Sequence, residues 1–63
     1  MEINEKIRNY MDENGIKQTF LEKETGLSHD KISKILCGKR KLSAYELSLF
    51  AKALKVSADI FLN

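Results

Sequence analysis

The chain has 63 residues, of which 43% are hydrophobic, and a formal net charge of +2. This length predicts one domain over residues 1–63 with a single core and no deep substrate cavity, and the one cysteine, Cys37, excludes an internal disulfide. No apolar run reaches the ~20 residues of a membrane span and the amino end lacks a signal-peptide pattern, so we expect a cytoplasmic protein. With no proline and no long apolar–polar alternation, every predicted element is a helix.

The first two predicted helices are separated by a glycine. Apolar residues of the first helix recur at helical spacing, at Ile3, Ile7, Tyr10 and Met11. Gly15 suits the left-handed conformation that ends such a helix, and Ile16 can fold back onto Met11. A second helix is predicted from Gln18 to Thr25, ending at Gly26.

The other predicted helices begin at serines that can act as caps. Ser28 can cap a third helix that ends near Gly38, and its inward residues are Ile32, Ile35 and Leu36. Ser43 and Glu46 form a capping box at the start of a fourth helix, whose buried stripe comprises Leu47, Phe50, Ala51 and Leu54. Ser57 can cap a last short helix over residues 58–62.

Positive charge gathers in the middle of the chain. Residues 25–45 hold five cations and one acid, a local balance of +4, whereas the remainder holds six cations and eight acids, a balance of −2. A basic region on an otherwise slightly acidic molecule favours a polyanionic partner. A solvated loop whose lysines only aid solubility explains the charge equally well, so the charge alone leaves both interpretations open.

The polar side of the third helix is the candidate site. At about 100° per residue, the side opposite its apolar residues carries Asp30, Ser33, Lys34 and Cys37. Lys34 can donate to guanine, Ser33 can bond several bases, and Asp30 can accept from cytosine, although phosphates would repel it. A solvated face with an Asp30–Lys34 pair is the simpler interpretation of this helix alone. Its position between a tight turn and the basic residues favours major-groove contact instead.

The order and spacing of several residues resemble the Cro and phage-repressor type of helix-turn-helix family. The resemblance covers residues 3–62 and includes the tail AKALKVSADIFL. Its matching residues are Gln18, Leu21, Gly26, Leu27, Ser28, Ile32, Ile35, Gly38, Lys39, Arg40 and Lys41. It implies an all-α, lambda-repressor-like bundle of five helices that binds double-stranded DNA as a regulator.

The resemblance also assigns roles to residues. Gln18 would brace both a phosphate and the third helix. Base reading is assigned to His29, Asp30, Ser33 and Lys34. Contacts with the DNA backbone are assigned to Gln18, Lys31, Lys39, Arg40 and Lys41.

Three residues in the second helix or at its start depart from the family's pattern. Glu22 stands where a small residue is usual, because the second and third helices cross closely there. Thr25 replaces an apolar residue, which predicts weaker packing of this helix. Lys17 occupies the cap position, where serine or threonine would bond the first N–H groups.

A repressor-like regulator is the function that these features predict, and we expect neither a cofactor nor a metal. Two copies on a palindrome are expected to meet through the carboxyl-terminal residues Val56, Ile60, Phe61 and Leu62. The alternative is a protein-interaction module, such as an antitoxin or antirepressor, which Asp30 and Phe20 favour. No residue set resembles a nucleophile with its base, a carboxylate pair or a phosphate loop, so we expect no enzyme activity.

Overall fold

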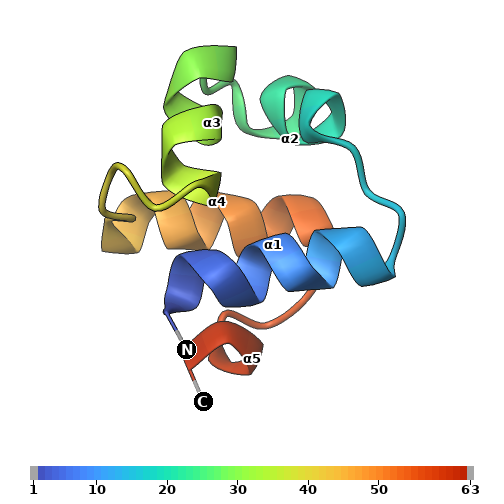
Figure 1. Cartoon of the computed structure of the whole chain (residues 1–63). Coiled ribbons are helices and arrows are strands. Elements are labelled where there is room, and N and C mark those ends of the chain that lie inside the picture. The colour runs from blue at the N-terminus through green and yellow to red at the C-terminus, as the bar shows by residue number, and fades with distance from the viewer. Residues whose placement is uncertain (1, 63) are drawn as a thin grey trace.

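A computed structural model describes residues 2–62, which form five helices and no strand. The helices are α1 (Ile3–Glu13), α2 (Gln18–Thr25), α3 (His29–Leu36), α4 (Ala44–Leu54) and α5 (Asp59–Leu62), drawn in Figure 1. The sequence predicted an all-α bundle with helices in these places, and this prediction is confirmed. Met1 and Asn63, the ends of the predicted domain, lie outside the described residues.

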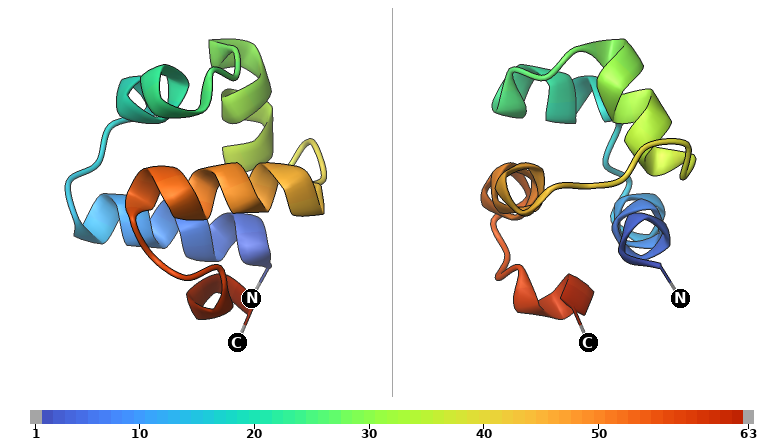
Figure 2. Two further views of the ribbon diagram at one scale, coloured as in Figure 1. Left: turned by 180° about the vertical axis from the view of Figure 1, so that it is seen from behind. Right: turned by 90° about the vertical axis from the view of Figure 1, so that its left-hand side faces the viewer.

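The helices form a small bundle in which α2 and α3 lie on one side of α1 and α4, and α5 lies on the other (Figure 2). Helix α2 packs against α3 and α4, while α1 packs against α3 and α5. Helix α3 is therefore held by α2, the helix directly before it, and by α1 at the amino end.

Every helix contributes to the core. The largest fully buried side chains are Ile7, Leu21, Ile32, Ile35, Phe50 and Phe61. The ring of Tyr10 meets the ring of Phe61 edge-on, with centroids 5.7 Å apart. Aromatic pairs of this geometry add to the stabilisation that burial provides, so this contact helps to attach the short α5 to α1.

The predicted helix ends are present. Beyond α1, Gly15 adopts a left-handed φ of +64°, and the N–H of Ile16 donates to Met11 O at 2.9 Å. The Ser28 hydroxyl accepts from the N–H of Lys31. Ser43 and Glu46 form the complete capping box at the start of α4.

One expectation about an individual residue is corrected, and another agrees with the structure. Cys37, which the sequence placed on the polar side of the third helix, is exposed and directly follows the last residue of α3. Phe61, expected to take part in a contact between copies, is only 2% exposed, because the core of the bundle contains its side chain. Ile60 and Leu62, its neighbours, are the exposed apolar residues of α5.

Candidate nucleic-acid interface

Helices α2 and α3 are joined by a short turn over residues 26–28. Gly26 ends α2 with a left-handed φ of +76°, and its N–H donates to Glu22 O at 3.0 Å. The Thr25 hydroxyl donates to Leu21 O at 2.6 Å and accepts from the N–H of Leu27 at 3.2 Å. Thr25, a departure from the family's pattern, thus replaces apolar packing with two hydrogen bonds that shape the turn.

The orientation of α3 is set by its buried side. Ile32 and Ile35 are fully buried, so the opposite side of the helix, which carries Asp30, Lys34 and Cys37, faces outward. Lys34 Nζ lies 3.1 Å from Asp30 Oδ2, and both side chains are more than half exposed. Ser33 is half-buried beside them. The predicted base-reading residues of this helix therefore lie together on one surface.

A polar network joins the start of α3 to α2. His29 Nδ1 lies 2.7 Å from Glu22 Oε2 and 3.0 Å from Gln18 Nε2, and Gln18 Nε2 also donates to His29 O at 3.2 Å. One Nδ1 atom cannot donate to the carboxylate and accept from the amide at once. The shorter distance favours an Nδ1–H that donates to Glu22, with the Gln18 amide donating to the backbone carbonyl.

In this network Glu22 links α2 to the start of α3. The carboxylate stands at the crossing of α2 and α3, where a small residue was expected, and it contacts the imidazole of His29. The His29 side chain remains 69% exposed. With Nδ1 engaged, Nε2 is the ring atom that His29 can offer to a ligand. This pairing is not visible in the sequence, because the two residues lie on different helices.

The basic loop after α3, residues 39–41, is held in place by hydrogen bonds to its backbone groups. The N–H groups of Lys39 and Arg40 both donate to Lys34 O, at 2.9 and 3.2 Å. From α1, Asn4 Nδ2 donates to Ile35 O at 2.7 Å and to Arg40 O at 3.2 Å. The sequence pattern did not predict this role for Asn4, although its polar side chain lies on the same helical stripe as Ile7 and Met11, where an apolar residue is usual.

Arg40 and Glu46 form an ion pair that anchors the same loop to α4. Arg40 Nη2 lies 2.9 Å from Glu46 Oε2, and the Glu46 side chain is only 6% exposed. The Ser43 N–H donates to Glu46 Oε1 at 3.0 Å. This backbone hydrogen bond is the main cause of a lowered pKa of Glu46; burial opposes it, while the Ser43 hydroxyl and the charges of Arg40 and Lys31 reinforce it.

The predicted backbone-contact residues therefore fall into two groups. Lys39 and Lys41 are exposed, whereas Arg40 is half-buried and paired with Glu46. Its Nε atom is buried without a hydrogen-bond partner among the described residues. Lys31 is half-buried, and its charge acts on Glu46. Gln18 lies at the other end of the surface, beside His29.

In the part of the chain that the structure describes, no helix is long and apolar enough to cross a membrane. Within residues 2–62, no group of three histidine, cysteine or acidic side chains is placed to hold a metal ion.

Comparison with known protein families gives a match over most of the chain. A family model described as Helix-turn-helix matches residues 7–61, which include α2, the turn and α3. No curated protein and no solved structure matches the chain. The match covers well over half of the chain, and the geometry of residues 18–36 is that of the motif. The chain therefore belongs to the Cro and repressor type of helix-turn-helix family, and it is a DNA-binding regulator of that family.

Proposed function

We propose that this protein is a sequence-specific, repressor-like transcriptional regulator, a single domain over residues 1–63 that acts in the cytoplasm. Helix α3 would enter the major groove of double-stranded DNA. The observation that carries the proposal is the fixed outward side of α3, bordered by the polar network at one end and by the basic loop at the other. A rigid polar helix with cations beside it fits the width and charge of a major groove.

Base reading is assigned to four residues at the exposed side of α3: His29, Asp30, Ser33 and Lys34. Lys34 would donate to guanine O6 or N7, and His29 would offer Nε2 to a base edge or a phosphate. The exposed Asp30–Lys34 pair is worth only ~0.2–0.5 kcal/mol, so a base can compete for either partner. Asp30 would accept a hydrogen bond from cytosine N4, and its negative charge would weaken binding wherever a phosphate comes close.

Contacts with the DNA backbone would set the register of the helix. Gln18 at the start of α2 and the exposed Lys39 and Lys41 can reach phosphates on either side of the groove. Lys31 and Arg40 would contribute from the inner side of this surface. Because Glu46 engages Arg40, the main contribution of Arg40 would be to hold the loop, and its N–H groups other than the buried Nε–H would be directed at phosphate.

Two copies would occupy a palindromic site. One domain this small has a limited contact area, and paired half-sites would lie one helical turn apart, ~34 Å between centres. The carboxyl-terminal contact would involve Val56 and the exposed Ile60 and Leu62. We propose neither a cofactor nor an enzymatic activity.

Selection of bound duplexes from a random pool, followed by salt titration, tests the proposal. The selected site is expected to show a preferred sequence with two related halves. Replacing Lys39 and Lys41 by alanine should flatten the plot of log affinity against log salt by about 0.9 for each lost phosphate contact. The matched control is Lys52→Ala on α4, which should leave the slope unchanged. An unenriched pool would contradict sequence-specific reading.

A second candidate function is a protein-interaction module such as an antitoxin or antirepressor. Its supporting observations are the exposed carboxylate of Asp30 on α3 and the ring of Phe20, which is 42% exposed. Such a module would bind random duplexes weakly or not at all at low salt, which the same titration measures.

A further inference from the structure

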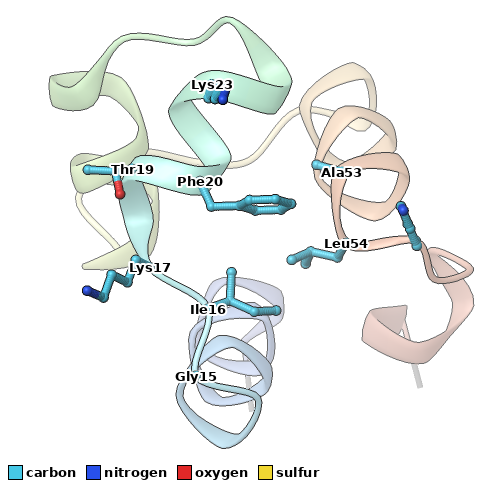
Figure 3. Close-up of a pocket in the computed structure, with 9 residues that line it drawn as sticks. Gly15, Ile16, Lys17, Thr19, Phe20, Lys23, Ala53 and Leu54 are labelled. Carbon is cyan, nitrogen blue, oxygen red and sulfur yellow. The ribbon is translucent and has the colours of Figure 1, made fainter.

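A groove lies between α2, the end of α4 and the turn that follows α1. Its volume is about 640 Å³. Figure 3 shows the ring of Phe20 pointing from α2 towards Ala53 and Leu54 of α4, with Ile16 below it. These four apolar side chains form the floor. The other lining residues are Gly15, Lys17, Thr19, Lys23 and Lys55.

The groove and the proposed DNA surface lie on different sides of α2. Gln18 and Glu22 are four residues apart, so they share the side of α2 that contacts His29 of α3. At about 100° per residue, Phe20 lies roughly 160–200° around the helix from both. A molecule in the groove would therefore leave the outward side of α3 accessible.

The charged residues that line the groove have one sign. Outside residues 25–45 the chain has six cations and eight acids, and three of those six cations, Lys17, Lys23 and Lys55, line the groove while none of the acids does. Among residues 2–62, none of the ion pairs involves these three lysines. Lys17 directs its amino group away from the ring of Phe20 in Figure 3, so Lys23 and Lys55 are the cations to test.

We propose that this groove binds an acidic segment of a partner protein that inserts one or more bulky apolar side chains between Phe20 and Leu54. The half-exposed aromatic ring and the aliphatic floor suit an apolar anchor, and the lysines around them select carboxylates beside it. Phosphates of nucleic acid would meet the lysines, but the floor offers them no hydrogen-bond donors. The partner would thus bind the regulator on the side that α3 does not use.

The probe is a short synthetic peptide in which glutamates flank one phenylalanine and two leucines. Backbone amide shifts of the full chain, followed by NMR during titration, should move at Ile16, Phe20, Ala53 and Leu54. Two control peptides define the chemistry: one with lysines in place of the glutamates, and one with serines in place of the apolar residues. Neither should move these amides.

Charge reversal in the chain provides the matched variants. Lys23→Glu with Lys55→Glu should weaken the acidic peptide about tenfold, because each change turns an attraction into a repulsion, and should create binding of the lysine peptide. The control, Arg8→Glu with Lys52→Glu, changes net charge equally on exposed residues outside the groove and should leave peptide affinity unchanged.

Four results would overturn the proposal. Two concern the peptide: the acidic peptide does not bind, or both double variants lower its affinity equally. Two concern the amide shifts of the groove residues: duplex DNA causes them instead of the peptide, or they grow with protein concentration alone. The last would assign the groove to a second copy of this chain. DNA affinity measured on the same samples is a separate readout, so failure of this proposal and failure of DNA binding are distinguishable.

Discussion

Two ion pairs near α3 use the same chemistry in different surroundings. Asp30 and Lys34 form one of them on the outer side of α3, with both side chains more than half exposed. Arg40 and Glu46 form the other between the basic loop and α4, with the carboxylate almost fully buried. An exposed pair is weak and can open for a ligand, whereas a buried pair is costly to break. The first pair therefore suits recognition and the second suits positioning.

Removing the buried carboxylate should have the largest effect on the free energy of unfolding. Glu46→Ala leaves the half-buried guanidinium of Arg40 without its partner and removes half of the capping box. We expect a loss of about 3 kcal/mol, measured by urea unfolding. A loss under about 1 kcal/mol would show that the pair does not anchor the loop.

Removing the exposed cation should change DNA binding and leave stability almost intact. Lys34→Ala is expected to cost about 1–3 kcal/mol of binding to the selected duplex and to relax the preference at one base position. Duplex titrations with the preferred and substituted base measure both. The matched control is Lys52→Ala. An equal loss on every duplex would reassign Lys34 to phosphate contact.

Acid should destabilise the protein through Glu46. Because the pKa of Glu46 is lowered in the folded chain, its contribution to stability is present above the unfolded pKa and is lost as pH falls through the folded pKa. The window thus begins near the ordinary value of 4.5 and extends below it. Urea unfolding of Glu46→Gln at several pH values should show a weaker loss below that point. An unchanged acid dependence would show that other carboxylates dominate it.

Removing the exposed carboxylate should have the smallest effect on stability. Asp30→Ala is expected to change the free energy of unfolding by only ~0.2–0.5 kcal/mol. Its effect should appear in DNA binding, where loss of a negative charge raises affinity for random duplexes and lowers discrimination. Competition between the selected site and random DNA measures this ratio. Stronger discrimination by the variant would argue against a reading role for Asp30.

Local signals explain which parts of the fold the sequence could predict. The helix ends at Gly26, Ser28 and Ser43 depend on residues a few positions away, so their chemistry is visible in the chain. The capping role of Glu46 is local in the same way. Its pairing with Arg40 across a loop was not predicted, because loop geometry decides which of several cations approaches a given carboxylate.

The contacts that shape the candidate site depend on packing between helices. Asn4 reaches residues 31 and 36 positions away in the sequence, and His29 meets Glu22 only because α2 and α3 cross. No periodicity encodes such pairs. The sequence predicted which residues face outward on α3, and the three-dimensional arrangement showed which of its charged residues are already engaged.

The most direct test of the central claim is an NMR titration of the chain with its selected duplex. Amide shifts should cluster at Gln18, His29, Lys34 and residues 39–41, while the groove around Phe20 stays unchanged. Shifts that cluster elsewhere, or amides that do not move at all, would contradict the assignment of α3 and the basic loop as the DNA-binding surface.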